Sequence, residues 1–295
     1  MNDRDWLAER FETHRPHLRA VAYRMLGSLS EADDAVQDAW LRLNRADTRD
    51  VDNLGGWLTT VVARLCLDML RSRKARREDP MGVHVPEPII AGADATDPEQ
   101  ELLLADSVGL AMLVVLETLT PAERLAFVLH DTFGLPFDEI APIVGRSTTT
   151  TRQLASRARR RVRGATTSSD VDVARQREVV DAFLAAARAG DFEALLRVLD
   201  PNVIVRADAG AGPSLLGRTR EVRGARAVAK QAFGFRRLAD GARRALVNGA
   251  AGLVVFDGAQ PFAVLGFTIR GKKIVEIDIL ADAARLKGLD LSSVE

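Results

Sequence analysis

The sequence has 295 residues, and because domains usually contain roughly 100 to 200 residues, this length indicates two domains rather than one. Hydrophobic residues make up 47% and charged residues 28%, which is typical of a globular protein and excludes a disordered or collagen-like chain. Lys+Arg and Asp+Glu both number 41, so the formal net charge is zero. That balance excludes a uniformly basic nucleic-acid coat protein, and any charged function must depend on local patches.

Residue types that carry much of enzyme chemistry are scarce. Cys66 is the single cysteine, which excludes an internal disulfide framework and a multi-cysteine zinc site. No histidine lies beyond His130 and the single tyrosine is Tyr23, so the later residues cannot use a His or Tyr mechanism. No signal-peptide pattern and no apolar run of roughly 18 residues is present. We therefore expect a cytoplasmic protein with no membrane contact, no metal and no cofactor.

Residues 4 to 79 show apolar positions at the helical spacings of three and four. One apolar stripe follows the acidic segment 31–34, which suits a helix N-terminus. A second stripe, from Trp57 to Leu70, runs directly into a cationic segment from Arg71 to Arg77. The pattern predicts a helical domain whose last helix has a buried face and a basic end.

Between residues 79 and 106, prolines, small residues and acidic residues replace the periodicity. This composition predicts a linker. Its central segment 85–90 is more apolar than a free tether needs, and we expect part of it to dock on a surface.

A second helical block, residues 98–163, contains a clear helix start at residues 120–123. There Thr120 supplies the N-cap oxygen, proline takes the first helical position, and Glu123 reaches back to the cap amide. Further on, the pattern predicts a helix over 136–144, a left-handed turn at Gly145 and a helix capped by Ser147. This arrangement is a helix followed by a tight turn and a second helix.

The polar segment 164–170 predicts a short second linker. After it, the sequence shows helical spacing first and strand-like runs later. Helical spacing holds around Phe183 and again after Gly190. Strand-like runs follow at residues 203–205, 245–247, 253–256, 262–269 and 274–280, with turn residues at 248–249, 257–258 and 271. Helices followed by a meandering sheet indicate an α+β domain.

The predicted helix from Ser147 to Arg163 has the chemistry of a recognition helix. Reading DNA in the major groove needs short polar side chains for base edges and cations for phosphates, and this segment has a polar start and a cationic end. A solvated basic helix end is the alternative, but the preceding helix and glycine turn favour DNA binding. The candidate DNA-contacting residues are Ser147, Thr149, Thr150, Arg152, Gln153, Ser156, Arg157 and Arg160.

The two helical blocks stand in a specific order. Residues 31–43, 53–62 and 67–71 resemble conserved region 2 of bacterial extracytoplasmic-function (ECF) sigma factors, and residues 120–163 resemble their region 4. The resemblance implies a dissociable, non-enzymatic subunit that directs RNA polymerase core to specific promoters. Its partners would be promoter DNA and the polymerase core, through the β′ clamp helices and the β flap.

The same resemblance implies a role for each surface. Residues that would dock on the clamp helices are Asp34, Gln37, Asp38, Leu41 and Arg42. A loop over residues 47–53 and the helix that follows would open and read the −10 element, with candidates Asn53, Trp57, Arg64, Arg71, Arg73 and Lys74. The recognition helix would read the −35 element. Trp57 could stack on a base, but its place in an apolar stripe favours core packing.

Two positions depart from the family pattern. Thr151 stands where an aliphatic residue is usual, and we expect its hydroxyl to bond back to a carbonyl within the helix. Pro142 lies inside the first helix of the pair, where it removes an amide donor and should kink the backbone.

Residues 171–295 resemble the SnoaL-like branch of the NTF2-like superfamily, in the segments 183–196 and 199–203. The resemblance implies helices and a strongly curved sheet around an apolar pocket. Sigma factors with this appended domain carry a Pro-Glu-Pro motif in the linker and a glycine-rich Asp motif, here residues 208–213 without the usual lysine. The implied regulatory residues are Pro86, Glu87, Pro88, Asp208, Gly210 and Gly212.

The expected fold is therefore multidomain: two all-α sigma domains, the second with a helix-turn-helix, followed by an α+β NTF2-like, SnoaL-like, cone-shaped domain. The expected boundaries are 1–79 for the region 2 domain, 80–106 for the linker, 107–164 for the region 4 domain, 165–170 for a short linker and 171–295 for the SnoaL-like domain.

Two functions compete for the last domain. One is proton transfer by a carboxylate, for which the candidates are Asp208, Asp257, Glu276 and Asp278. The favoured one is an intramolecular regulator that contacts the linker or the sigma domains, helped by the high effective concentration of a covalent link. A helix-turn-helix repressor with a small-molecule-sensing pocket is the alternative for the whole chain, although a repressor has no need of the acidic helix over 33–43.

Overall fold

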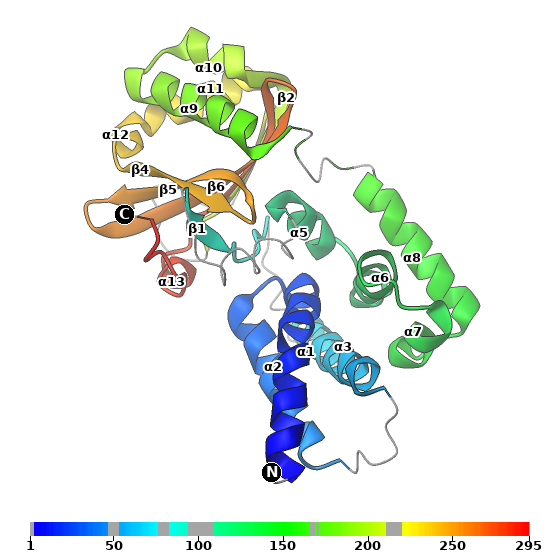
Figure 1. The fold of residues 1–295 in the computed structure, drawn as a ribbon. Coiled ribbons are helices and arrows are strands. Elements are labelled where there is room, and N and C mark those ends of the chain that lie inside the picture. The colour runs from blue at the N-terminus through cyan, green and yellow to red at the C-terminus, as the bar shows by residue number, and fades with distance from the viewer. Residues whose placement is uncertain are drawn as a thin grey trace. The chain divides into compact units, whose positions relative to one another are not determined.

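The computed structural model describes residues 3–46, 53–75, 83–93, 109–163, 165, 169, 171–210 and 220–294 (Figure 1). The chain divides into two compact units, one made of Met1–Asp79 with Leu116–Gly164 and the other of Pro80–Val115 with Ala165–Glu295. Helix α5 (Leu110–Glu117) spans the boundary between the two units along the chain. None of the helices within the described ranges combines the length and the apolar character needed to cross a membrane.

The first unit opens with three helices, α1 (Asp3–Leu26), α2 (Leu29–Leu43) and α3 (Leu54–Ala75). Helix α2 begins where the Ser28 hydroxyl accepts a hydrogen bond from the Glu31 amide. Most positions of the apolar stripes predicted from the sequence are buried, namely Val36, Ala39, Leu43, Leu58, Val61, Val62, Leu65 and Leu70, whereas Trp40, Trp57 and Met69 are partly buried. Each large apolar side chain buried in this way contributes roughly 1.5–3 kcal/mol to folding.

The second half of this unit contains α6 (Pro121–Phe127), a π-helical turn η1 (Val128–Thr132), α7 (Phe137–Val144) and α8 (Thr148–Arg163). The predicted capping box is present, because the Glu123 amide donates to Thr120 Oγ1 at 3.3 Å and the Thr120 amide donates to Glu123 Oε2 at 3.1 Å. Gly145 ends α7 in the predicted left-handed conformation, with φ of 72°. Pro142 lies inside α7, which continues to Val144.

The two halves of the first unit share one core. Arg124 on α6 is 3% exposed, and its Nη1 donates to the Met25 carbonyl oxygen and pairs with Glu117, both at 2.8 Å. The Phe133 ring, which follows η1, lies 5.0 Å from the His17 ring of α1 in an edge-to-face contact. Region 2-like and region 4-like helices therefore pack into a single compact body.

The second unit is built on one seven-stranded sheet with the strand order β1-β4-β5-β6-β7-β2-β3. The strands are β1 (Ile90–Gly92), β2 (Leu199–Asp208), β3 (Arg220–Arg223), β4 (Ala242–Val247), β5 (Ala250–Asp257), β6 (Gln260–Arg270) and β7 (Lys273–Leu280). Its helices are α9 (Val173–Ala189), α10 (Phe192–Val198), α11 (Ala225–Gly234), α12 (Arg236–Ala239) and α13 (Ala283–Leu286). All strand pairs are antiparallel except β2 with β7.

Local signals in the sequence located most of these strands. The five predicted strand runs lie inside β2, β4, β5, β6 and β7. The turn glycines adopt positive φ, as does Asn248 with φ of 50°. Strands β1 and β3 were not predicted: the three residues of β1 lie in the segment interpreted as a linker, and the four residues of β3 are mostly charged and show no strand-like apolar run.

The sheet buries both of its faces. Helices α9, α10 and α11 cover one face (Figure 1), where Phe183 and Leu195 pack against Leu253 and Ile277. Part of the other face is covered by Val85 and Ile90 of the linker and by Leu110 of α5, which join the cluster Ala245, Val247, Val254, Val264 and Leu280. Strand β1 pairs with β4 from Ile90↔Val247 to Gly92↔Ala245, so the expected docking of the linker segment is confirmed within this unit.

Candidate nucleic-acid interface

Helix α8 separates a buried face from a polar face. Thr151 is fully buried, and its hydroxyl donates to the Ser147 carbonyl oxygen at 3.0 Å, as predicted for this departure from the family pattern. Ala155, Ala158 and Val162 complete the buried face. The Ser147 hydroxyl accepts from the Thr150 amide at 3.2 Å and so caps the helix. These contacts fix which side chains face outward.

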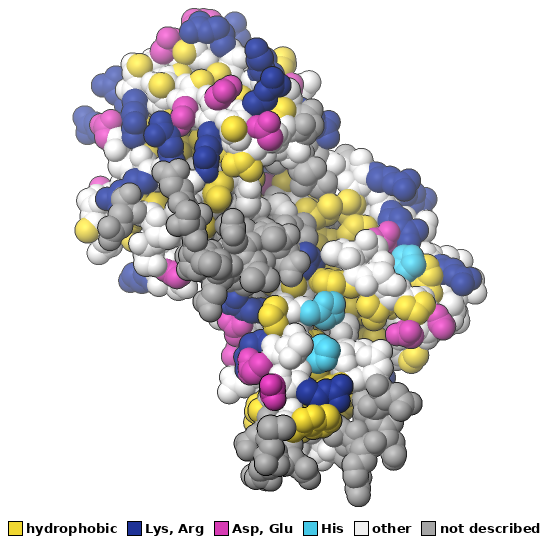
Figure 2. Space-filling model, in the orientation of Figure 1, with side chains coloured by type: hydrophobic (Ala, Val, Ile, Leu, Met, Phe, Trp, Pro, Cys, Tyr) yellow, Lys and Arg dark blue, Asp and Glu magenta, His cyan; other side chains and the backbone are white. Residues whose placement is uncertain are grey.

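The predicted DNA-contacting residues lie on the outward face of α8. Thr150 is partly buried, and the others are exposed, namely Ser147, Thr149, Arg152, Gln153, Ser156, Arg157 and Arg160. In Figure 2, Lys and Arg side chains gather over this helix. The helix therefore presents polar side chains at its start and cations along its length, as a major-groove contact requires.

The arginines of α8 fall into two groups. Arg159 pairs with Asp131 at 2.5 Å, and Arg161 pairs with Glu123 at 3.0 Å, so both help to hold α8 on α6 and η1. Among the ion pairs of the described residues, none involves Arg152, Arg157 or Arg160. The Arg152 guanidinium lies 5.8 Å from the centre of the Phe137 ring, and all three side chains are exposed, so these cations remain accessible to an external anion.

The acidic helix α2 presents a second exposed face. The predicted polymerase-docking residues Asp34, Gln37, Asp38, Leu41 and Arg42 are all exposed. Leu41 is 44% exposed, and with Trp6 and Phe233 it is one of three large hydrophobic side chains exposed among the described residues. The buried face of α2 at Ala35, Val36 and Ala39 fixes this orientation. The outward face of α2 therefore combines one apolar side chain with acidic and basic ones, and a protein interface on this face stays a prediction.

Two arginines at the basic end of α3 form contacts within the first unit. Arg73 pairs with Glu31 and donates to the Leu26 carbonyl oxygen at 3.3 Å. Arg71 donates to the Val144 carbonyl oxygen over a long 3.5 Å, whereas Arg64 and Lys74 are exposed. Of the cations predicted for the −10 surface, Arg73 is therefore used inside the first unit, whereas Arg64, Arg71 and Lys74 are exposed.

The start of α3 gives structural roles to two candidates. Asn53 accepts a hydrogen bond from the Gly56 amide at 3.0 Å through Oδ1, and Trp57 is partly buried in α3. Residues 47–52 of the expected melting loop, together with Arg76 and Arg77, lie outside the described residues.

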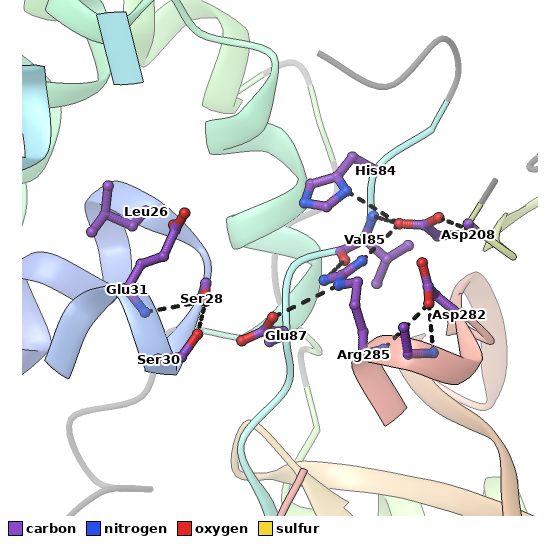
Figure 3. A network of polar contacts seen from close by, with 12 residues as sticks. Leu26, Ser28, Ser30, Glu31, His84, Val85, Glu87, Asp208, Asp282 and Arg285 are labelled. Atoms are coloured by element: carbon purple, nitrogen blue, oxygen red, sulfur yellow. Dashed lines mark hydrogen bonds and ion pairs between the residues drawn. The ribbon is translucent and has the colours of Figure 1, made fainter. Parts of the chain in front are cut away.

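A buried carboxylate in the second unit holds the linker (Figure 3). Asp208 is 4% exposed, and its Oδ2 accepts from the Val85 amide at 3.1 Å and from Arg285 Nη1 at 2.9 Å. His84 Nδ1 lies 3.2 Å from the same oxygen. Arg285 also donates through Nη2 to the Val85 carbonyl oxygen at 2.6 Å and lies 3.8 Å from Glu87. Asp208 and Arg285 together bind the backbone N–H and the carbonyl oxygen of Val85.

The electrostatics of Asp208 agree with this geometry. Burial alone would raise its pKa, but hydrogen bonds from His84, Val85 and Gly210, with the charge of Arg285, hold the pKa below its ordinary value. Gly210 has φ of 66°, and a side chain there would overlap Asp282, so the turn requires glycine. Gly212 lies outside the described residues.

The Pro-Glu-Pro motif lies in the docked segment. Pro86 and Pro88 are buried and Glu87 is partly buried. Just beyond, the side-chain oxygen Oδ1 of Asn248 accepts a hydrogen bond from the backbone N–H of Ile89 at 3.1 Å. The backbone N–H of Asn248 donates to the Ile89 carbonyl oxygen at 2.8 Å. Sequence reasoning interpreted Asn248 only as a turn residue. It also missed His84 and Arg285, because no local pattern marks a contact so distant in the chain.

The carboxylates considered for catalysis do not converge on one cavity. Asp208 binds the linker, and Asp257 is exposed at a hairpin turn. Glu276 and Asp278 both pair with Arg206, the latter at 3.2 Å. Burial raises the pKa of Asp278 to about 6, and the charge of Arg206 offsets this only in part. These contacts give Asp208, Glu276 and Asp278 structural roles, and Asp257 lies in the turn before Gly258.

Comparisons with known proteins agree with this organisation. The chain matches the family models for sigma-70 region 2 over residues 10–76 and sigma-70 region 4 over residues 110–162. It is 41% identical over 296 residues to the ECF RNA polymerase sigma factor SigJ of Mycobacterium tuberculosis, covering 95% of this chain and 93% of that protein. It is also 41% identical over 220 residues to the probable ECF sigma factor SigI of that species, covering 75% and 76%.

The fold of the whole chain has a solved counterpart. The crystal structure of the Mycobacterium tuberculosis sigma factor SigJ aligns with a TM-score of 0.77 at 37% identity, over 96% of this chain and 99% of that chain. The predicted fold class, helical sigma domains followed by an α+β domain, is confirmed. The helix-turn-helix repressor kept as an alternative is not favoured, because the similarity includes region 2 and its acidic helix.

Proposed function

Because this chain belongs to the ECF family of RNA polymerase sigma factors, which bind polymerase core and promoter DNA and are not enzymes, we propose a role for each of its surfaces. The exposed face of α8 reads the −35 element. The basic side of α3 reads and helps to open the −10 element, and α2 docks on the β′ clamp helices around Leu41. The region 4 helices contact the β flap.

The second unit acts as a built-in regulator of this activity. The observation that carries this proposal is the linker segment Val83–Ala93, which joins the two sigma regions in the chain and is bound inside the second unit. Asp208 and Arg285 bind Val85, Asn248 binds Ile89, and β1 extends the sheet. Arg177 adds a hydrogen bond to the Ala93 carbonyl oxygen.

A linker held in this way sets the reach between the two sigma regions. The eleven residues Val83–Ala93, held in the second unit, take roughly 35–40 Å of contour length out of the free tether, at about 3.3–3.6 Å per residue. Since both regions must contact one promoter together, release or capture of this segment changes how easily they do so. Whether capture of the linker raises or lowers transcription is measured by the experiment below.

The test is run-off transcription with purified core polymerase, combined with hydrogen exchange of the linker amides. Arg285→Ala removes the donor to the Val85 carbonyl oxygen and should speed exchange at Val85 and Ile89 and change the transcript yield. Arg226→Ala is the matched control, because Arg226 is an exposed arginine of the same unit. Faster exchange with an unchanged yield would contradict the regulatory role.

A further inference from the structure

A polar cavity of about 180 Å³ lies in the second unit beside the β4–β5 hairpin. Its lining includes Leu110 of α5, Gly266 and Thr268 of β6, and Asp278 of β7. Gly266 pairs with Asp278 across the two strands. A Cβ atom at position 266 would lie 2.9 Å from Leu110 Cδ2, so the glycine leaves room above the sheet. The cavity therefore forms where the sheet lacks a side chain beside a buried carboxylate.

The polar side chains of this cavity lie on the face of the sheet opposite the helix-covered core. Phe267 of β6 and Ile277 of β7 belong to the core cluster that packs against α9 and α10. Successive side chains of a strand point to opposite faces, so Thr268 and Asp278 face away from that cluster. The sheet itself separates these polar groups from the apolar core.

Two oxygen atoms at this cavity have no hydrogen-bond partner within the described residues. The side chains that carry them, Asp278 and Thr268, belong to residues that are 2% and 5% exposed. Asp278 accepts a hydrogen bond from Arg206 Nη1 through Oδ1 at 3.2 Å, whereas its Oδ2 and Thr268 Oγ1 take part in no such bond. Neither atom is among the fully enclosed, unpartnered side-chain atoms of these residues, so both border open space. They remain available to an occupant of the cavity.

The charges beside the cavity favour a cation. Glu276 and Asp278 are both buried, and Arg206 is their one shared cationic partner among the ion pairs of the described residues. A single guanidinium cannot neutralise two ionised carboxylates, and burial accordingly raises the pKa of Asp278 to about 6. A cation in the cavity would supply the missing positive charge, whereas an anion would add a further negative charge to a buried site.

The donors and the size of the lining narrow the occupant further. An ammonium group donates three hydrogen bonds and accepts none, which suits the free oxygen atoms of Asp278 and Thr268. Leu110, Ala111 and Val247 give the cavity an apolar wall, against which a short hydrocarbon part can pack. Because a cavity of about 150 Å³ holds benzene, this one has room for about six non-hydrogen atoms.

We propose that this cavity binds a small primary ammonium compound, whose charged group donates to Asp278 Oδ2 and Thr268 Oγ1 and whose apolar part packs against Leu110. The site includes neither Asp208 nor Arg285, which hold the linker. The proposal concerns binding alone, so it stands or fails independently of the regulatory role of the linker.

Three fluorinated probes of similar size separate the relevant charges in ¹⁹F NMR titrations of the full chain. 3-Fluoropropylamine is a cation at about pH 7.5, 3-fluoropropanol is neutral, and 3-fluoropropionate is an anion. We expect saturable binding of the amine, about tenfold or more tighter than the alcohol because its hydrogen bonds are charge-assisted, and no saturable binding of the propionate. No saturable binding of the amine, or equal binding of amine and alcohol, would overturn the proposal. Displacement of the amine by potassium chloride but not by choline chloride at equal ionic strength would assign the site to an inorganic cation and would also overturn it.

Two variants locate the site. Asp278→Asn removes the negative charge at the cavity and should abolish saturable binding of the amine. Asp257→Asn makes the same change at an exposed hairpin turn and should preserve binding. Thr268→Val keeps the shape of the side chain without its hydroxyl and should weaken amine binding about two- to tenfold, through the loss of one hydrogen bond. Unchanged binding by Asp278→Asn would overturn the proposal. If that variant fails to fold, the Thr268→Val titration decides, and an unchanged affinity there would overturn the proposal.

Discussion

Helix α8 and the Asp208 site place similar charged side chains in opposite environments. On α8, Arg157 and Arg160 are exposed and lie outside the ion pairs of the described residues. In the second unit, Asp208 is 4% exposed and Arg285 lies 2.9 Å away, with both bound to the linker. In the sequence, both sets appear only as charged residues, and their exposure or burial is seen only in the structure.

The difference determines what each set of charges can do. Exposed cations keep their hydration in the free protein, and they bind phosphates by releasing condensed counterions from DNA. A buried pair has already lost its hydration, so its hydrogen bonds must be satisfied within the protein. The cations of α8 are therefore suited to an external partner, whereas Asp208 and Arg285 are suited to holding part of their own chain.

The largest expected effect follows from removing Asp208. Asp208→Ala leaves the Arg285 guanidinium without its buried acceptor. Loss of one partner of a fully buried ion pair costs about 3–5 kcal/mol, and the lower end applies here because the Arg285 side chain is 18% exposed and keeps the Val85 carbonyl oxygen and Glu87. We expect the free energy of unfolding of the second unit to fall by about 3 kcal/mol. Urea unfolding followed by far-UV circular dichroism measures the change.

The protein supplies an internal control for that experiment. All three tryptophans, Trp6, Trp40 and Trp57, lie in the first unit, so tryptophan fluorescence reports on that unit alone. The fluorescence transition should not move. Asp257→Ala, at an exposed hairpin turn, should leave both transitions unchanged, and a loss below about 1 kcal/mol in Asp208→Ala would contradict the structural role.

A second buried carboxylate, Asp278, makes the stability of the second unit depend on pH, unlike the exposed charges of α8. The folded pKa of Asp278 is raised to about 6 from 3.8, so its protonated form is favoured on folding. Stability from this group is fully present below pH 4 and is lost as pH rises through 6. The loss is about 2–3 kcal/mol, at about 1.36 kcal/mol per pKa unit.

Asp278→Asn should remove this dependence, so the variant gains stability relative to wild type between pH 4.5 and 7.5 in urea unfolding. Asp290→Asn is the control. Hydrogen bonds from Ser292 lower the pKa of exposed Asp290, so its contribution changes only below about pH 4. A constant difference between Asp278→Asn and wild type across this range would show that Asp278 is ionised in the folded protein as in the unfolded chain.

The sequence predicted features whose partners lie within a few residues. The capping box of Thr120 and Glu123 spans three residues, and the Thr151 hydroxyl bonds four residues back. The Asp208–Arg285 pair spans 77 residues, and the hydrogen bond from Arg285 to Val85 spans 200. No local period marks such contacts. Periodicity therefore predicted the longer helices and five of the strands but missed α11, α12, α13, β1 and β3. Of the residues that bind the linker, the family resemblance named Asp208, and nothing in the sequence indicated Arg285.

On α8 itself, base reading should separate from phosphate binding. Gln153 is exposed on the polar half of the helix, and Gln153→Ala should relax preference at particular base pairs by about 1–3 kcal/mol. Competition binding of the polymerase holoenzyme to promoter duplexes with single base-pair changes measures this. An equal loss of affinity on every duplex would show that Gln153 does not read bases.

The smallest effect distinguishes two adjacent arginines of α8. Arg160 is exposed, whereas Arg159 pairs with Asp131 at 2.5 Å. Arg160→Ala should lower the salt dependence of promoter binding by about 0.9 in the slope of log K against log salt, which corresponds to one phosphate contact. Arg159→Ala should leave the slope unchanged, because that cation is already neutralised by a carboxylate of its own unit. Equal slopes in the two variants would mean that pairing within the protein does not decide which cations of α8 meet DNA.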